Sequence, residues 1–213
     1  MVYRTTALRL DRDQVLRERI LNCALERVAE GGFAALTMQG LAENVGIATG
    51  SLYRHFHSKG ELAAEVFASA SQREVDALAT ALRGPGTPAE RLRAGLRQFA
   101  ARAWDSRRLA FALIAEPVDP EVDEQRLLYR EAYAELFTEL LEEGVAQGAF
   151  QVQHIGLIAA CLVGAIAEAL VGPLSPPARA AREAGRLSLE LDEVCQSLAT
   201  FCLRAVGAEE PKP

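Results

Sequence analysis

Residues 37–60, TMQGLAENVGIATGSLYRHFHSKG, constrain the fold more than any other segment, because they predict two short helices joined by a glycine turn. Thr37 is an N-cap candidate, and Leu41 and Val45 give the first helix an apolar face at i, i+4 spacing. Gly46 stands where the chain must turn sharply, which favours a residue that tolerates positive φ. Two helices that cross through such a turn form a helix-turn-helix, whose second helix can enter the major groove of DNA.

The second helix, expected from about residue 48 to residue 55, has two distinct faces. Ala48, Leu52 and Phe56 fall on one narrow arc of a helix and predict a core-facing stripe. The opposite face and its shoulders carry small, polar and cationic residues: Thr49, Gly50, Ser51, Tyr53 and Arg54. Small residues let a helix approach base edges closely, and the donors beside them can hold phosphates. The alternative interpretation is a small helical core with a solvated polar face.

A third helix is expected to begin at Lys59, with Ser58 as its N-cap. Lys59 would then lie at a helix N-terminus, where its charge and the free N–H groups both favour a phosphate. The pattern also extends upstream, to a helix over about residues 12–30 and its exit at residues 31–33. These additions favour DNA binding over a solvated polar face.

Residues 20–67 resemble the N-terminal domain of the TetR (tetracycline-repressor) family of bacterial transcription regulators. The positions that carry the resemblance are Gly32–Phe33, Thr37, Leu41–Ala42, Val45–Ile47, Gly50–Phe56, Lys59 and Leu62. The resemblance implies an all-α protein with two domains. Residues 1–60, the head, would form a three-helix helix-turn-helix DNA-binding domain with its motif at about 37–56. Residues 61–213, the body, would form a helical ligand-binding and dimerisation domain.

The resemblance also implies a homodimer that reads successive major grooves of a palindromic double-stranded DNA operator. The residues expected at phosphates are Thr37, Tyr53, His55 and Lys59. The residues expected near base edges are Gln39, Thr49, Gly50, Ser51 and Arg54. Gly50 has no side chain and can only let the backbone approach or contact the DNA, so its neighbours must distinguish the bases of the operator. Gln39 could pair bidentately with adenine, and Arg54 with guanine or a phosphate.

Charge is unevenly distributed along the chain. The net charge is −6, but residues 1–60 carry +2 and the remaining residues carry −8. A cationic head on an acidic body permits DNA binding, because binding depends on the electrostatic field near the contact face and not on the net charge of the whole chain. The N-terminus lacks the apolar region of a secretory signal, and the uncharged run 155–167 is short for a membrane span. We therefore expect a cytoplasmic protein that does not enter the membrane.

The cysteines and histidines show no pattern that predicts a metal, a cofactor or catalysis. The cysteines are Cys23, Cys161, Cys195 and Cys202. They form no CxxC pair and have no metal-ligand spacing with the three histidines, and no nucleophile–base set emerges. An enzyme is therefore disfavoured. Small buried hydrophobes are the simplest interpretation of the cysteines, and a thiol switch is the alternative.

Beyond residue 60 the pattern indicates only helices, expected at about residues 59–82, 88–105, 107–116, 120–147, 154–171 and 187–206. The last two have unusually apolar or small faces, composed of Gly156, Ala160 and Gly164 on one helix and Leu191, Cys195, Leu198 and Cys202 on the other. Under the resemblance, these helices from both protomers form a four-helix dimer interface. The alternative is that both faces are intrachain core.

The middle helices carry six aromatic residues that are candidates for the wall of an effector pocket: Phe99, Trp104, Phe111, Tyr129, Tyr133 and Phe137. The TetR family holds its inducer in this region, but no single role carries over, and each aromatic could equally be core. Arg107 and Arg108 could accept an anionic headgroup, although a solvated helix start is the simpler interpretation.

The function expected from these features is a DNA-binding repressor released from its operator by a small hydrophobic or amphipathic ligand. The alternative is a similar regulator controlled by thiol oxidation or by a partner protein.

Overall fold

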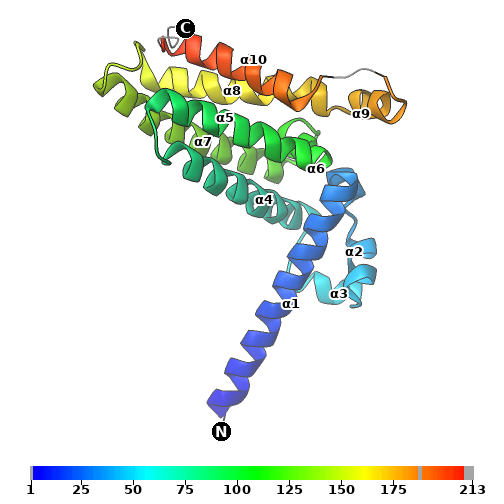
Figure 1. The fold of residues 1–213 in the computed structure, drawn as a ribbon. Coiled ribbons are helices and arrows are strands. Elements are labelled where there is room, and N and C mark those ends of the chain that lie inside the picture. Colours follow the sequence, from blue (N-terminus) through cyan, green and yellow to red (C-terminus); the bar gives the residue numbers. More distant parts are fainter. Residues whose placement is uncertain (1, 187–188, 209–213) are drawn as a thin grey trace.

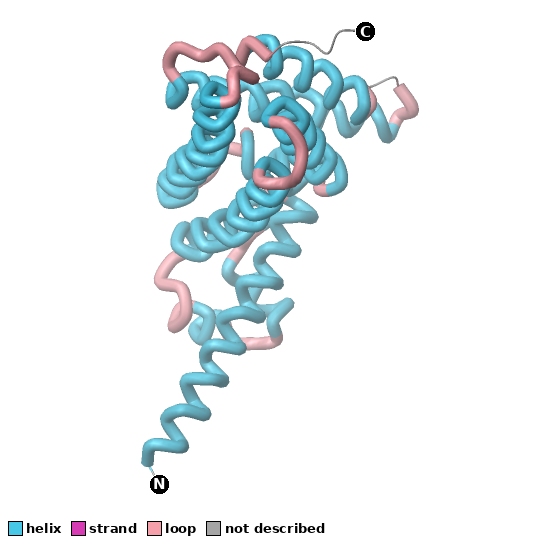
Figure 2. Tube along the Cα trace, turned by 60° about the vertical axis from the view of Figure 1, so that its left-hand side comes forward, coloured by secondary structure: helices cyan, strands magenta, loops and turns pink. Residues whose placement is uncertain are grey.

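The structure, a computed structural model, describes residues 2–186 and 189–208, with side chains from residue 12 onward. Within these residues all regular elements are helical, which confirms the predicted all-α class (Figures 1 and 2). In chain order they are α1 (Val2–Gly31), η1 (Phe33–Ala35), α2 (Met38–Val45), α3 (Thr49–Leu52), α4 (Lys59–Leu82), α5 (Pro88–Asp105), α6 (Arg107–Ile114), α7 (Pro120–Ala146), α8 (Ile155–Leu174), α9 (Pro176–Glu183) and α10 (Leu191–Ala205).

The head forms around the C-terminal half of α1, and the first turns of α1 extend beyond α2 and α3 (Figure 1). Ile20 of α1, Leu41 of α2 and Leu52 of α3 are fully buried against one another and against Phe56. Full burial of side chains of this size contributes about 1.5–3 kcal/mol each. The same apolar cluster takes in the first turns of α4 as far as Phe67, so α4 is part of the head core as well as of the body.

The body is a bundle in which α4 packs against α5 and α7, α7 packs against α8, and α10 covers α5 (Figure 1). Its core is continuous from Leu78 and Leu82 at the end of α4 to Val206 after α10. Because α4 contributes to both apolar clusters, it is a rigid connection between the head and the helices behind it.

Local capping explains why several predicted helix boundaries agree with the structure. Ser58 caps α4, and its side chain accepts a hydrogen bond from the backbone N–H of Glu61. Thr87 and Glu90 form a reciprocal capping box at the start of α5, next to Pro88 in the first turn. Both helices span the residues that the sequence predicts.

The structure differs from the predictions near the prolines that follow α8. Helix α8 continues through Pro173 to Leu174, and an unpredicted helix, α9, begins at once with Pro176 and Pro177. The sequence places these two prolines outside any helix, between the helices expected at 154–171 and 187–206. They lie instead in a first turn, where the N–H that proline lacks would have no partner inside the helix.

Helix α8 is also the one described helix with the length and apolarity to cross a membrane, with a mean hydropathy of 2.2 over its most apolar window. One side of the helix packs against α5, α6, α7, α9 and α10. Only 22% of the window is buried within the protomer. An apolar face of α8 is therefore uncovered.

Candidate nucleic-acid interface and ligand cavity

The turn between α2 and α3 is fixed at both ends of α2. The Thr37 side chain accepts a hydrogen bond from the backbone N–H of Gly40, as predicted for an N-cap. Gly46 ends the helix in the left-handed region, with φ 75° and ψ 38°. A Cβ at Gly46 would meet nothing within 4 Å, so the backbone angle, not space, requires glycine there. Arg19 of α1 donates to the carbonyl of Val45 at 2.7 Å and fastens this corner to α1.

The second helix of the motif is shorter than predicted. Helix α3 covers Thr49–Leu52 and continues as a turn, in which the backbone N–H of His55 bonds the carbonyl of Leu52 at 3.0 Å. Ala48 is its N-cap and is exposed, so Ala48 does not belong to the predicted core stripe. The N-cap residue lies outside the helical path, and helical periodicity does not apply to it. Leu52 and Phe56 are buried as expected.

The nine residues predicted to contact DNA are all at least partly exposed. Six are exposed and three are half-buried: Thr37, Gln39, Gly50, Tyr53, Arg54 and Lys59, and then Thr49, Ser51 and His55. The Arg54 guanidinium donates to the Ser51 hydroxyl at 2.9 Å, and the Gln39 amide donates to the Glu43 carboxylate at 3.1 Å. The start of α2, the exposed part of α3 and the start of α4 therefore each carry accessible hydrogen-bond donors.

Gly50 is exposed on α3, and a Cβ there would meet nothing within 4 Å. Its φ is not positive, so the backbone does not require glycine either. Neither packing nor strain inside the protein explains this residue. A bare backbone on an exposed helix face lets another molecule approach closely.

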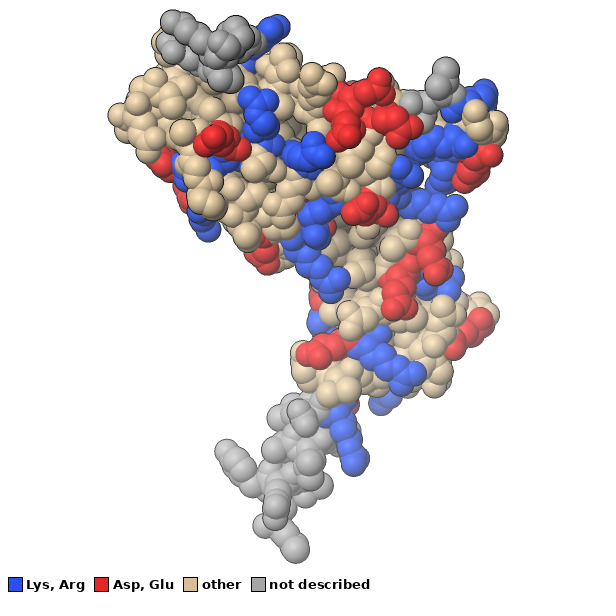
Figure 3. Space-filling view, viewed as in Figure 1, with Lys and Arg blue, Asp and Glu red and all other residues tan. Residues whose placement is uncertain are grey.

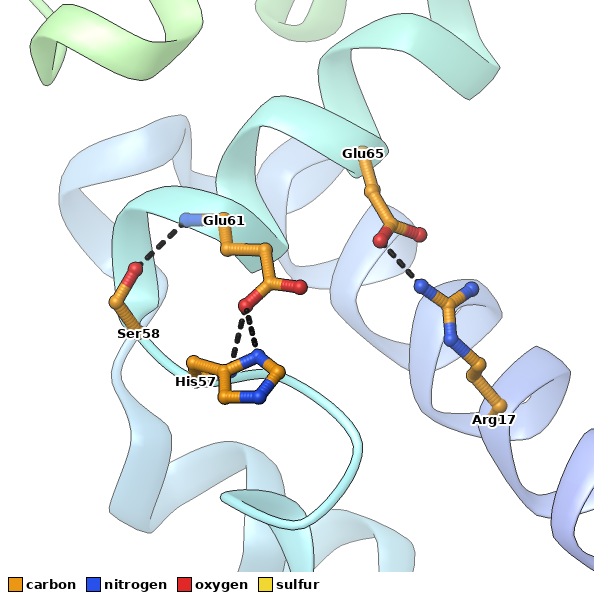
Figure 4. Close-up of polar contacts among 5 residues, drawn as sticks. All are labelled: Arg17, His57, Ser58, Glu61 and Glu65. Carbon is orange, nitrogen blue, oxygen red and sulfur yellow. Dashed lines mark hydrogen bonds and ion pairs between the residues drawn. The ribbon is translucent and has the colours of Figure 1, made fainter.

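The start of α4 is held by contacts that the sequence analysis did not identify (Figure 4). The Glu61 carboxylate accepts hydrogen bonds from the His57 backbone N–H at 2.5 Å and from His57 Nδ1 at 3.0 Å. The bond from the His57 backbone is the main cause of a lowered Glu61 pKa. Arg17 of α1 pairs with Glu65 one turn further along α4. The Ser-x-x-Glu spacing at residues 58–61 is the signal that could have indicated this cap. These contacts hold the first turns of α4 in place, and Lys59 is the first residue of that helix.

A second missed contact joins the head to the body. The Glu116 carboxylate, in the loop after α6, accepts hydrogen bonds from the backbone N–H groups of Phe33 and Ala34 at 3.0 and 3.1 Å. Gly32 precedes them with φ 75°, and a Cβ there would collide with the same carboxylate. A lone glutamate in a loop carries no sequence signal for such a partner.

The body contains an apolar cavity of about 100 Å³, lined by residues of α4, α5, α6, α7 and α8. Four of the predicted pocket aromatics line it: Phe99, Tyr129, Tyr133 and Phe137. Phe111 and Trp104 lie outside the lining, and Trp104 faces a neighbouring groove instead. Phe67 lines the cavity and also belongs to the apolar cluster of the head.

Most residues that line the cavity are apolar, and its polar members are Ser71, Glu74, Arg102, Ser106, Arg126, Tyr129, Arg130 and Tyr133. Glu74 and Arg102 form a bidentate ion pair with N–O distances of 2.6 and 2.8 Å. Ser71 is buried, and burial raises the pKa of Tyr133, which keeps its phenol a neutral donor. An apolar space with a small number of fixed polar groups is the usual design of a small-molecule site.

Arg126 connects the cavity to the end of α6. It lines the cavity and donates to the carbonyls of Leu113 and Glu116 at 3.1 and 2.9 Å. Because the Glu116 side chain holds the head, Arg126 touches both the ligand space and the contact that positions η1. Its third bond goes to Asp123 of α7 at 2.7 Å.

The two predicted dimer faces differ in exposure. Gly156, Ala160 and Gly164 of α8 are exposed, and a Cβ on either glycine would meet nothing within 4 Å. On α10 the predicted stripe points inward. Its members Cys195, Leu198 and Cys202 are buried in the body core, and Leu191 is half-buried. The stripe points inward because α10 packs against α5, and the more apolar face of α10 is buried in that contact. The outer face of α10 carries Phe201, which is 60% exposed.

Comparisons with known proteins agree with this geometry. The family model described as bacterial regulatory proteins, tetR family, matches residues 20–66. The model described as tetracyclin repressor-like, C-terminal domain, matches residues 85–170. The HTH-type transcriptional repressor KstR of Mycolicibacterium smegmatis is 40% identical over 78 residues, 36% of this chain and 37% of that protein. KstR of Rhodococcus jostii is 39% identical over 57 residues, 27% of each chain. The matched part thus spans roughly a third of the length of these curated relatives.

Solved structures show the same fold over nearly the whole chain. The fatty acid degradation regulator FadR of Bacillus halodurans has 20% sequence identity and a TM-score of 0.71, covering 88% of this chain and 94% of its own. FadR of Bacillus subtilis, solved in complex with stearoyl-CoA, has 17% identity and a TM-score of 0.72, covering 89% of this chain and 98% of its own.

The exposed α3 on an all-helical body defines a two-domain helix-turn-helix protein. With family models matching both its head and its body, the chain belongs to the TetR family of bacterial regulatory proteins, which confirms the resemblance found in the sequence.

Proposed function

We propose that this protein is a transcriptional repressor that binds a palindromic DNA operator as a homodimer and releases it when a small amphipathic ligand enters the body. The observation that carries the proposal is the exposed face of α3. Its bare Gly50 stands between Thr49 and Ser51, Arg54 follows one turn later, and Lys59 is exposed at the start of α4. A helix with a close-approach position between hydrogen-bond donors is suited to a DNA groove and to its phosphates.

A gel-shift assay with the DNA upstream of the protein's own gene tests DNA binding. We expect a shift that weakens as salt is raised, because lysine and arginine contacts release counterions from DNA. Unrelated DNA of equal length is the control for specificity. No salt-sensitive shift at any protein concentration would refute the repressor function.

The homodimer is supported by the uncovered face of α8. The small residues Gly156, Ala160 and Gly164 would let a partner helix approach closely, and Leu157 beside them is 63% exposed. An apolar face of this length on a protein that works in water needs a cover. A dimer would place two α3 helices about 34–36 Å apart, the spacing of successive major grooves. The proposed place of action is the cytoplasm, where bacterial DNA lies.

The ligand proposal is supported by the cavity and by the stearoyl-CoA that the Bacillus subtilis neighbour binds. At about 100 Å³ the cavity is smaller than the roughly 300–1,000 Å³ of pockets that hold drug-sized molecules. A long-chain ligand would therefore have to move the lining helices apart. Phe67 and Arg126 would carry that movement to the head, through the head core and through the end of α6.

Release requires that the ligand bind the DNA-competent state less tightly than the released state, because a ligand shifts an equilibrium only by its difference in affinity. By reciprocity, operator DNA should then weaken ligand binding by the same factor. Measuring ligand affinity with and without operator DNA tests this point. Equal affinities would refute regulation through the cavity and leave DNA binding standing.

Regulation by thiol oxidation is the second candidate, and it depends on Cys161, which is exposed on α8. The buried cysteines are poorly suited to it, because burial raises the pKa of Cys202 to about 11 and also raises that of Cys195. DNA release by a mild oxidant, abolished in Cys161→Ser, would favour the thiol mechanism over the ligand.

A further inference from the structure

A groove lined by four arginines opens between the end of α1, the start of α6 and α9. The arginines are Arg107, Arg108, Arg179 and Arg182, and the carboxylates of Asp105 and Glu183 accompany them. Figure 3 shows basic side chains gathered at this edge of the molecule, around α9. Four guanidinium groups against two carboxylates make the arginine groove cationic on a chain with a net charge of −6.

Two of these arginines share one aromatic ring. The guanidinium carbons of Arg107 and Arg182 lie 4.9 and 5.9 Å from the centre of the Trp104 ring. Burial lowers the pKa of Arg182, and the charge of Arg107 lowers it further. Two like charges are thus held close together beside an indole. A negative charge between them would remove the repulsion.

The same two arginines have hydrogen-bond capacity to spare. Arg182 donates from Nη1 to the carbonyl of Pro173 at 2.8 Å. Its Nη2 atom and the Nε atom of Arg107 are buried, and neither has a partner among residues 12–186 and 189–208. Buried donors without acceptors are costly and rare. A ligand that brings several anionic oxygens would give them acceptors once the two side chains turn toward the groove, and the planar guanidinium group matches a phosphate in two-bond geometry.

The arginine groove adjoins the apolar cavity. Ser106, at the junction of α5 and α6, lines both. At the end of α5, just before Ser106, Ala103 lines the cavity and Trp104 lines the groove. One molecule with an apolar chain and an anionic end could therefore occupy both spaces at once.

We infer that the arginine groove binds the phosphate group of an amphipathic ligand whose apolar chain occupies the cavity. The inference rests on the proposed ligand-responsive function and adds the chemical class of the ligand, a long-chain phosphate ester. It also assigns Arg107 and Arg182 as the residues that distinguish this class from an unphosphorylated lipid. Two sources carry such a phosphate, a lysophospholipid and the nucleotide part of an acyl-CoA thioester.

Trp104 is the single tryptophan of the chain, so its fluorescence reports on the arginine groove without a label. The full-length protein is titrated with monostearoylglycerol, with the same lipid carrying a phosphate, and with stearoyl-CoA. We expect at least one phosphorylated probe to bind about tenfold or more tightly than monostearoylglycerol, because hydrogen bonds to a charged group are the stronger ones. The tighter of the two identifies the source of the phosphate. Equal binding of all three probes would overturn the inference.

The double variant Arg107→Gln/Arg182→Gln should lose this preference, whereas Arg93→Gln, an exposed arginine of α5, should keep it. If circular dichroism shows that the double variant is unfolded, the single variants Arg107→Gln and Arg182→Gln are measured in its place. If a folded variant of the groove still prefers the phosphorylated probe to monostearoylglycerol as strongly as the wild type does, the arginine groove is not the site.

Operator binding is followed in parallel by fluorescence anisotropy of labelled DNA. Groove-dependent binding of a phosphorylated probe without DNA release would leave the site standing and refute induction. DNA release that the groove variants do not alter would support induction and overturn the site.

Discussion

The Glu116 carboxylate accepts a hydrogen bond from the backbone N–H of Phe33 at 3.0 Å, although 83 residues separate them in the sequence. Glu116 follows the helix that lines the cavity, and Phe33 belongs to the head core. Arg126 holds the Glu116 carbonyl from the cavity side. This contact is one of several that join α6 and the residues after it to the head, because Ala112 of α6 is also buried in the head core.

Replacing Glu116 with glutamine should weaken this contact, because an amide oxygen is a poorer acceptor than a carboxylate and its NH₂ group cannot accept from Ala34. We expect a loss of about 1–2 kcal/mol in the free energy of unfolding. We also expect a smaller effect of the ligand on DNA affinity. Urea unfolding and DNA binding with and without ligand measure both. Glu124→Gln, at an exposed position of α7, is the control, and equal ligand coupling in the two variants would contradict the prediction.

Gly50→Ala should separate stability from DNA binding. The added methyl group meets nothing within 4 Å, so the helix should gain up to about 1 kcal/mol from the better propensity of alanine. DNA affinity should fall if a base pair approaches this backbone as proposed. Thermal unfolding and gel shift on the same preparation measure the two effects. Unchanged affinity together with raised stability would show that Gly50 does not face the groove.

Lys59→Ala and Arg54→Ala should differ in what they change. Losing a phosphate contact at Lys59 should weaken binding to all DNA sequences alike and reduce the salt slope by about 0.9. Losing Arg54 should relax discrimination among operator variants if its side chain reaches a base edge. Affinities for the operator and for scrambled DNA at several salt concentrations measure both. A sequence-dependent loss for Lys59→Ala would contradict its assignment to a phosphate.

Glu61 should contribute to loss of stability in acid. Its pKa is lowered in the folded state, chiefly by the backbone hydrogen bond from His57, so the carboxylate is stabilised on folding. That contribution is present above the ordinary pKa of 4.5 and is lost as pH falls through the lowered value. We expect Glu61→Gln to be less stable than wild type at neutral pH, with the gap closing in acid. Unfolding free energies from neutral pH to about pH 3 test this, and a constant gap would exclude the carboxylate as its cause.

Ala160→Glu should split the proposed homodimer. Ala160 is exposed on α8 between Gly156 and Gly164, so a charge there costs the protomer little but would be buried without a partner in a helix–helix interface. Analytical ultracentrifugation should show a monomer with unchanged helix content. The matched control is Ala94→Glu, at an exposed position of α5. A dimer that survives Ala160→Glu would place the interface elsewhere.

Much of the fold could be predicted because its signals are local. The caps at Ser58 and Thr87 and the left-handed Gly46 act within one turn of chain, so the bounds of α4 and α5 and the corner after α2 follow from a few residues each. Helix α9 was missed because two prolines stop a helix when they fall inside it and start one when they fall in its first turn. Sequence alone does not tell which case applies.

The candidate sites could be predicted in part, from residues on one helix and from the aromatics of the middle helices, four of which line the cavity. The exposure of residues on α3 follows from the periodicity of the helix and could be predicted from the sequence, whereas their contacts with DNA stay a prediction. The direction of the α10 stripe depends on α5, the contact of Glu116 depends on a partner in another domain, and the arginine groove joins residues of α6 and α9. Helical periodicity and capping are properties of neighbours along the chain and can be read in order. Which faces meet, and which charges gather at one place, depends on how the helices pack in space, and that is decided only when the whole chain folds.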